Sequence, residues 1–235
     1  MAFILLIETA TETCSVALSS SGSLLAFRES SGGYNHSEKL TIYIEEVLSQ
    51  AGIDSAQLDA VCVSQGPGSY TGLRIGVSAA KGICYALGIP LIAISTLDSM
   101  ASNMTKSLKD HNLPVGKPFL LCPMLDARRM EVYTAIYNAE GERISEIEAK
   151  IIDENSFDDL TSENQLVVFG NGADKCIPFL SRPGIHFIKD IEASARFMSH
   201  LAYKRYQGKT FVDVAYFEPF YLKDFIATIP KNKIL

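Results

Sequence analysis

Several features that would point to other protein classes are missing from this sequence of 235 residues. Its five cysteines are odd in number and widely spaced, with no Cys-x-x-Cys pair, which argues against a disulfide framework or a zinc cluster. No basic leader precedes an apolar stretch, and no apolar run reaches the roughly 18 residues that a membrane-spanning helix needs. We therefore expect a protein of the reducing cytoplasm that makes no contact with membranes.

The chain also lacks an excess of positive charge. Its 21 lysines and arginines face 27 aspartates and glutamates, which gives a net charge of -6. No large positive field is therefore expected to hold nucleic acid through counterion release. With 47% hydrophobic and 20% charged residues, the composition is that of a folded globular protein and excludes wholesale disorder.

The two halves of the chain share one order of elements. The first half predicts strands at 3–7, 15–18 and 24–28, a helix at 37–48, a strand at 60–64, a helix at 72–87 and a strand at 91–94. After a stretch without periodicity, the second half predicts strands at 119–125, 131–137, 143–152 and 166–169, with a helix following. Internal repetition of this kind predicts a duplicated α/β fold with mixed sheets flanked by helices, divided into lobes at 1–106 and 107–235.

Each half places an acidic residue at the end of its first strand and a Gly-x-Gly sequence after a later strand. If the lobes pack pseudo-symmetrically, backbone N–H groups and hydroxyls could donate to phosphate oxygens while the carboxylates hold a cation. We expect no tightly bound cofactor, with ATP or ADP as the candidate ligand of the cleft or of a complex. Hydroxyl-rich turns also commonly satisfy their own backbone, so both interpretations stay open. The candidate cleft residues are Glu8, Thr9, Thr11, Gly66, Gly68, Asp126, Gly170 and Gly172.

The segment 64–76 is rich in glycine and has one proline, which is typical of a loop shaped for close approach. Ser69 or Thr71 is predicted to cap the helix that follows. The segment is not a P-loop, because no Gly-Lys-Ser/Thr follows. Arg74, between apolar neighbours, is expected to pair with a carboxylate or to reach the cleft.

Small residues recur every fourth position at Gly72, Gly76 and Ala80. Such a stripe lets another helix approach closely, although internal packing accounts for it equally well. Together with the apolar face of the helix at 37–48, which Ile42 widens, it forms a predicted partner surface. The residues of this surface are Leu40, Tyr43, Ile44, Val47, Gly72, Leu73, Gly76, Ala80 and Ile83.

The glycine-rich run at 66–76 resembles that of the bacterial TsaB family (formerly YeaZ) and of its catalytic paralogue TsaD. Weaker similarities at 4–18, 36–40, 124–133 and 219–223 extend the resemblance over nearly the whole chain. It implies the actin/hexokinase/Hsp70-like (ASKHA) fold of two duplicated lobes. It also implies a non-catalytic subunit that pairs with TsaD and acts with the ATPase TsaE. That complex transfers a threonylcarbamoyl group to the adenosine next to the anticodon of tRNAs reading A-starting codons.

Further expectations concern partners and catalysis. The chain alone should form a homodimer through its apolar helices, and it should meet tRNA only through the complex. TsaD-like proteins carry His-x-x-x-His after the strand matching 91–94, whereas residues 95–100 here contain no histidine. The resemblance thus implies no metal site, no catalysis by this chain alone and no glycoprotease activity of the M22-like kind.

A free-standing ASKHA phosphotransferase or nucleotidase is the second hypothesis. It would use Glu8 and Asp126 near a cation, although ASKHA phosphotransferases carry Asp where this chain has Glu8. Steady ATP turnover that is lost on Asp126→Asn would favour it.

Overall fold

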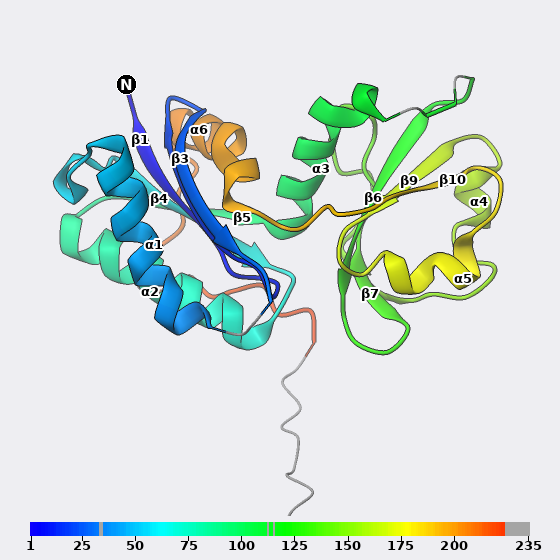
Figure 1. Cartoon of the computed structure of the whole chain (residues 1–235), viewed down its shortest axis with the longest axis horizontal. Helices are drawn as coiled ribbons and strands as arrows, with labels where there is room; N and C mark the ends of the chain where they lie inside the picture. Colours follow the sequence, from blue (N-terminus) through cyan, green and yellow to red (C-terminus); the bar gives the residue numbers. More distant parts are fainter. Residues whose placement is uncertain (33–34, 112, 115, 224–235) are drawn as a thin grey trace, which may run out of the picture.

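Two five-stranded sheets stand side by side in the computed structural model, each with helices packed on its faces (Figure 1). The structure describes residues 1–32, 35–111, 113–114 and 116–223. The first sheet has the strand order β3-β2-β1-β4-β5. Its β1, β4 and β5 are parallel, whereas β2 is antiparallel to both β1 and β3. These strands are β1 (Phe3–Glu8), β2 (Cys14–Ser20), β3 (Ser23–Ser30), β4 (Ala60–Gly66) and β5 (Leu91–Ser95).

The second sheet repeats this arrangement. Its order is β10-β9-β6-β7-β8, so its first strand in sequence is again central, with the second and third on one side and the fourth and fifth on the other. The predicted duplication is therefore confirmed at the level of topology. The strands are β6 (Phe119–Asp126), β7 (Glu131–Thr134), β8 (Glu148–Ile151), β9 (Gln165–Phe169) and β10 (Ile185–Ile188).

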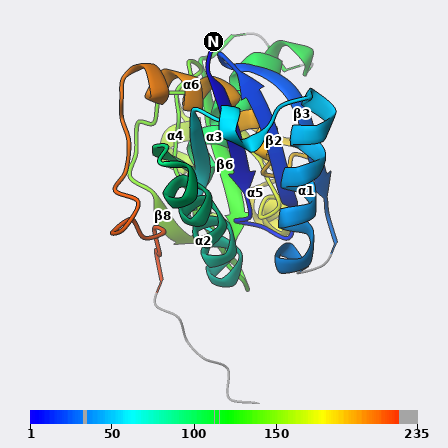
Figure 2. The same ribbon diagram turned by 90° about the vertical axis from the view of Figure 1, so that its left-hand side faces the viewer.

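Helices cover both faces of the first sheet. Alternate strand residues point to opposite faces, so Leu5 and Ile7 pack beneath α1 (His36–Ala51) and α2 (Tyr70–Leu87). Ile4 and Leu6 instead pack against the 3₁₀ turn η4 (Ala195–Met198) and α6 (Ser199–Gln207). Figure 2 shows α1 and α2 next to each other on one side of this lobe.

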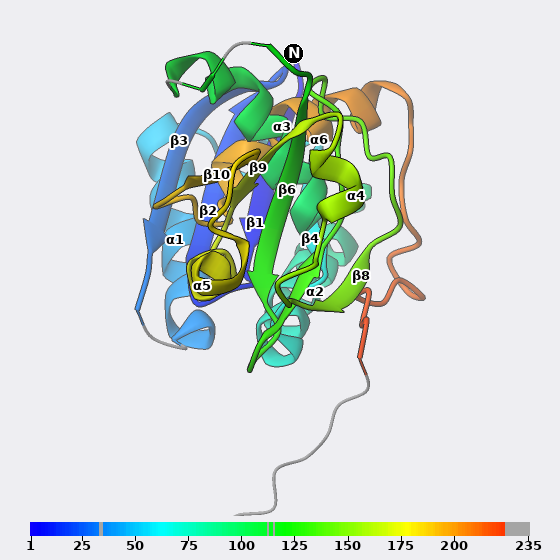
Figure 3. The same ribbon diagram turned by 90° about the vertical axis from the view of Figure 1, so that its right-hand side faces the viewer.

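The second sheet lies between α3 (Thr96–Ser107) on the side of the first lobe and two short helices on its outer side (Figure 3). The outer helices are α4 (Asp158–Thr161) and α5 (Ile177–Leu180). Contacts thus cross the division at 106/107, because α3 packs on the second sheet and α6 on the first. The lobe boundary itself stays a prediction, and the tail at 224–235 lies outside the described residues.

Local signals predicted the two long helices of the first lobe well. Ser69 caps α2 by accepting from the Gly72 N–H at 3.3 Å, as one of the two expected caps. Gly52 and Gly88 end α1 and α2 in the left-handed conformation, with φ of 65° and 66°.

Three expectations for the rest of the chain were wrong in extent. The strand predicted at 131–137 ends at Thr134, and only the last part of 143–152 forms β8. The helix expected after Gly172 is reduced to the 3₁₀ turn at Asp174–Cys176 and the single turn of α5. The ends of short strands such as β7 and the edge strand β8 depend on pairing with neighbouring strands more than on sequence pattern.

All five cysteines are buried and unpaired, and burial raises the pKa of the Cys14, Cys84 and Cys176 thiols to about 11. Among the described residues, no helix is both long and apolar enough to cross a membrane.

Candidate functional site

Glu8 ends β1 inside the protein, with no exposed surface. Its Oε1 accepts from the Ala10 N–H at 2.7 Å, whereas Oε2 has no hydrogen-bond partner among the described residues. Burial raises the pKa of Glu8 to about 7, against the lowering effects of the nearby Ser64 hydroxyl and the Ala10 and Thr9 amides. The Ser64 hydroxyl approaches the carboxyl without reaching hydrogen-bond geometry. Glu8 is thus partly protonated near neutral pH and closed to solvent.

Polar groups gather at the carboxyl ends of the parallel strands around Glu8. Ser64 near the end of β4 and Thr96 just after β5 are both buried, and neither hydroxyl has a hydrogen-bond partner within the described part of the chain. Strand alternation places Ser64 on the same face as Cys62, and that face also carries Glu8. The structure therefore brings Glu8 close to a second polar group that the sequence analysis had not selected.

The threonine-rich turn after β1 (residues 9–13) packs closely against the glycine-rich loop at 66–69. The Ala10 carbonyl accepts from the Ser69 N–H at 2.7 Å, and a Cβ on Gly68 would lie 2.3 Å from that same oxygen. The Thr11 hydroxyl accepts from the Thr13 N–H at 3.2 Å. This geometry matches a turn that satisfies its own backbone, and the glycines serve its close packing against the loop.

In the second lobe, the glycines pack against the end of the first strand in the same way, but the acidic residue there is not buried. Gly172 donates its N–H to the Met124 carbonyl at 3.0 Å, and a Cβ on Gly170 would lie 2.4 Å from that oxygen. Asp126 is exposed, pairs with Lys175 and accepts from the Arg128 N–H at 2.9 Å. One predicted carboxylate is thus buried and the other is ion-paired at the surface. Nucleotide binding at the cleft stays a prediction.

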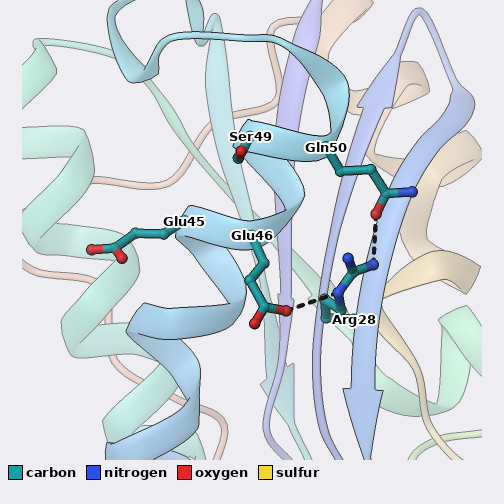
Figure 4. Close-up of a pocket in the computed structure, with 5 residues that line it drawn as sticks. All are labelled: Arg28, Glu45, Glu46, Ser49 and Gln50. Atoms are coloured by element: carbon teal, nitrogen blue, oxygen red, sulfur yellow. Dashed lines mark hydrogen bonds and ion pairs between the residues drawn. The ribbon is translucent and has the colours of Figure 1, made fainter.

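Two hollows in the described surface lie elsewhere. One, of about 570 Å³, lies between β3 and α1, where Arg28 bonds Glu46 at 2.8 Å and Gln50 at 2.6 Å while Glu45 points away (Figure 4). The other, of about 520 Å³, includes Asp59 and Tyr206. None of the eight candidate cleft residues lines either hollow.

The stripe of small residues on α2 faces inward, so its assignment to the partner surface was wrong. Gly72, Gly76 and Ala80 are buried, and a Cβ on Gly72 or Gly76 would lie 2.1 Å or 2.3 Å from Thr9 oxygens. The stripe lets α2 lie directly on the turn after β1. Three more residues of the predicted surface are buried in the core instead: Leu40, Val47 and Leu73.

Part of the predicted partner surface does reach solvent. Tyr43 and Ile44 on α1 and Ile83 on α2 are half-buried at the edge of the core. Ile75 and Ala79 precede Ile83 at one-turn spacing and form a half-buried apolar line with it. Ile42 on α1 and Tyr85 on α2 are exposed by 51% and 86%. We call Ile75, Ala79 and Ile83 the α2 line.

The sequence analysis missed the role of the segment 211–223, here called the strap. Its Val212 N–H donates to the Leu91 carbonyl of the edge strand β5 at 2.9 Å, and its Phe220 N–H donates to Gln65 at 2.7 Å. Lys81 on α2 donates to the carbonyls of Ala215 and Phe217 at 2.9 and 3.1 Å. These partners are more than 100 residues away in sequence, so no local pattern could have revealed them.

Arg74 also behaves differently from its two expected roles. Its Nε donates to the Tyr221 hydroxyl of the strap at 3.3 Å, and its guanidinium lies 4.7 Å from the Tyr70 ring centroid. It therefore helps to hold the strap, with no carboxylate bound to it among the described residues. The described residues contain no group of three or more His, Cys, Asp or Glu placed to hold a metal ion.

Comparison with known proteins connects this geometry to a family. Residues 30–166 match the family described as "TsaD: tRNA N6-adenosine threonylcarbamoyltransferase". The tRNA threonylcarbamoyladenosine biosynthesis protein TsaB of Escherichia coli is 31% identical over 232 residues, covering 95% of this chain and 96% of that protein. Its namesake from Bacillus subtilis is 32% identical over 146 residues, which are 61% of this chain and 58% of that protein.

Solved structures support the same fold. YeaZ from Pseudomonas aeruginosa has a TM-score of 0.79 at 24% identity, covering 94% of this chain and all of that chain. An inorganic polyphosphate/ATP-glucomannokinase from Arthrobacter sp. strain KM has a TM-score of 0.50 at 11% identity, covering 89% of this chain and 99% of the kinase. The expected ASKHA architecture is therefore confirmed.

Proposed function

Since the chain belongs to the TsaB (YeaZ) family, we propose that it acts in tRNA threonylcarbamoyladenosine biosynthesis as a non-catalytic partner of TsaD. In this role it binds TsaD through α1 and α2 and so enables transfer of the threonylcarbamoyl group to the adenosine beside the anticodon. The match to E. coli TsaB over 95% of the chain carries this proposal. TsaE acts with the pair, and the chain works in the cytoplasm.

The exposed sides of α1 and α2 support the partner role. The α2 line, with Ile44 and the exposed Ile42 and Tyr85, presents apolar surface on two adjacent helices. Apolar faces of this kind are typical of helical protein interfaces. Without its partner the chain would cover the same surface by forming a twofold homodimer.

The non-catalytic role is supported by the state of the two acidic residues. Glu8 is buried and so is closed to a ligand in this conformation, whereas Asp126 is exposed and paired with Lys175. Residues 95–100 also lack the histidine pair of the catalytic paralogue. The second hypothesis, a free-standing phosphotransferase, is less well supported for the same reasons. ATP or ADP, where bound, would be a ligand of the lobe cleft or of the complex.

Co-purification with TsaD from the same organism tests the partner surface. Ile83→Glu places a charge in the α2 line and should abolish co-elution with TsaD, while circular dichroism stays unchanged. The same variant should sediment as a monomer at micromolar concentration, where the unmodified chain is a dimer. Ile144→Glu is the matched control, because Ile144 is 56% exposed in the second lobe. Unchanged co-elution of the folded Ile83→Glu protein would contradict the assignment of this surface.

A further inference from the structure

Two consecutive arginines in the turn between β6 and β7 have unusual backbone conformations. Arg128 and Arg129 have φ of 69° and 50°, in the left-handed region that side chains other than glycine rarely adopt. Both are exposed, and neither guanidinium has a hydrogen-bond or ion-pair partner within the described part of the chain. Strained residues are often retained where they present a side chain for function.

The end of the strap brings a third cation beside this turn. Lys223 forms an ion pair with Glu131 at the start of β7, and its Nζ lies 6.0 Å from the ring centroid of Tyr133. Arg128 is joined to the same glutamate, because the Glu131 N–H donates to the Arg128 carbonyl at 3.2 Å. Burial raises the pKa of the Tyr133 phenol, and the charge of Arg128 acts to lower it. Lys223 and Arg128 therefore both contact Glu131, although they are 95 residues apart in sequence.

An aromatic pair adjoins these cations. Tyr221, two residues before Lys223, packs on Tyr70 with ring centroids 4.7 Å apart and an interplanar angle of 39°. Arg74 covers the Tyr70 ring and donates to the Tyr221 hydroxyl. We call Tyr70, Arg74, Arg128, Arg129, Tyr221 and Lys223 the basic-aromatic patch.

The charges around the patch leave it positive although the chain carries a net charge of -6. Asp126 forms an ion pair with Lys175, and Glu131 forms one with Lys223. Besides the Tyr221 hydrogen bond, the negative charge of Glu218 helps to raise the pKa of Arg74. Arg128 and Arg129 are left without a carboxylate partner among the described residues. In Figure 1 the strap, in orange to red, runs behind the first lobe, and its end emerges in the lower part of the view between α2 and the second lobe.

We propose that the basic-aromatic patch is a contact surface for RNA, with Arg128, Arg129 and Lys223 binding phosphates and the Tyr221–Arg74 pair stacking on an unpaired base. This inference rests on the proposed function and deepens it, since it revises the expectation that the chain meets tRNA only through its partner. Guanidinium groups bind phosphate in a bidentate manner, and aromatic rings and arginine planes stack on splayed bases of RNA loops. An acidic protein segment would use the cations but leave the stacked rings without a role.

The test compares variants for binding of an unmodified tRNA transcript, both as isolated chains and in the complex with TsaD. Removing two phosphate contacts in Arg128→Gln/Arg129→Gln should weaken binding at least tenfold and flatten its dependence on salt. Arg128→Lys/Arg129→Lys keeps the charges and should retain most of the affinity. Tyr221→Ala should weaken binding about fivefold or more through loss of stacking. Lys106→Gln/Lys109→Gln removes two exposed cations from α3 and its following turn, and should have no effect.

Equal tRNA affinity of Arg128→Gln/Arg129→Gln and the unmodified chain in both forms would overturn the proposal, as would equal weakening by the lysine control. Competition by poly-glutamate as effective as that by tRNA would also overturn it, in favour of an acidic protein partner. Modification kinetics separate this failure from that of the proposed function. If the unmodified chain supports no modification, the proposed function fails whatever the binding results. If it does support modification, the patch predicts a raised KM for tRNA in the glutamine variant with little change in kcat.

Discussion

Glu8 is the residue whose charge depends most on its surroundings. The sequence places a carboxyl at the end of a first strand, where a cation-binding role is plausible on chemistry alone. The fold buries this carboxyl completely, and burial raises its pKa to about 7. No local pattern reveals such burial, because it depends on Ser64, on the turn after β1 and on the packing of η4. Glu8 therefore affects stability in a pH-dependent way.

Replacing Glu8 by glutamine should remove that pH dependence. Between pH 4.5 and about 7, the folded protein retains a proton that the unfolded chain has released, so stability falls as the pH rises. Above pH 7 the cost of the buried charge is complete, on the order of 3 kcal/mol. In urea unfolding, the free energy of unfolding of the Glu8→Gln variant should therefore be higher than that of the unmodified protein by about 2 to 3 kcal/mol at pH 8. At pH 5 the difference should be less than about 1 kcal/mol. Glu45→Gln, at an exposed carboxylate, should show no such difference.

The glycines of α2 allow a matched pair of substitutions. A Cβ on Gly72 would lie 2.1 Å from the Thr9 carbonyl, so Gly72→Ala must move backbone and should cost about 3 kcal/mol. Gly82 lies in the same helix, and a Cβ there would meet no neighbouring segment within 4 Å, so Gly82→Ala should stabilise by about 1 kcal/mol through helix propensity. Thermal unfolding measures both. If Gly72→Ala were as stable as Gly82→Ala, the inward orientation of the stripe would be wrong.

Among the elements, α2 combines three roles on three sides. Its small-residue stripe lies on the turn after β1, its α2 line faces solvent beside α1, and Arg74 and Lys81 hold the strap on another flank. The sequence predicts the helix and its caps, because capping and periodicity are local. It does not predict which side faces inward. The sequence fits a partner surface and an internal contact equally well for the stripe of Gly72, Gly76 and Ala80. Only the position of Thr9 in the fold decides between them.

The helix α3 and the strap differ in how far they could be predicted from the sequence. α3 begins with Ser95, which accepts from the Asp98 N–H at 3.4 Å, and Leu97, Met100 and Met104 recur at helical spacing. These local signals could have predicted α3, although the sequence analysis did not include a helix there. The strap has no such signal, since its contacts with β5, α2 and β7 depend on the completed fold.

Lys81→Met should loosen the strap without disturbing α1. The substitution removes two donors to the carbonyls of Ala215 and Phe217 while keeping most of the apolar stem. A loss of about 1 kcal/mol of local stability corresponds to roughly fivefold faster hydrogen exchange. We expect this at the amides of Val212 and Phe217, and no change at Val47. Lys106→Met, at an exposed lysine without such bonds, should leave both regions unchanged. Equal exchange in the two variants would show that Lys81 does not hold the strap.

At the scale of the whole molecule, the repeated order of strands, acidic turns and glycine turns was sufficient to predict two lobes of one topology. The repeat did not predict that the lobes would diverge in charge. The carboxyl that ends the first strand is buried in one lobe and ion-paired at the surface in the other. The closing of one of the two acidic positions in a duplicated fold supports the proposed role of the chain beside a catalytic relative.

Reconstitution of tRNA modification tests this account most directly. Purified TsaD and TsaE, with threonylcarbamoyl-adenylate and an unmodified tRNA reading A-starting codons, are assayed for the modified nucleoside with this chain, without it and with its Ile83→Glu variant. The account predicts product only when the unmodified chain is present. Product formed at the same rate in its absence would contradict the account.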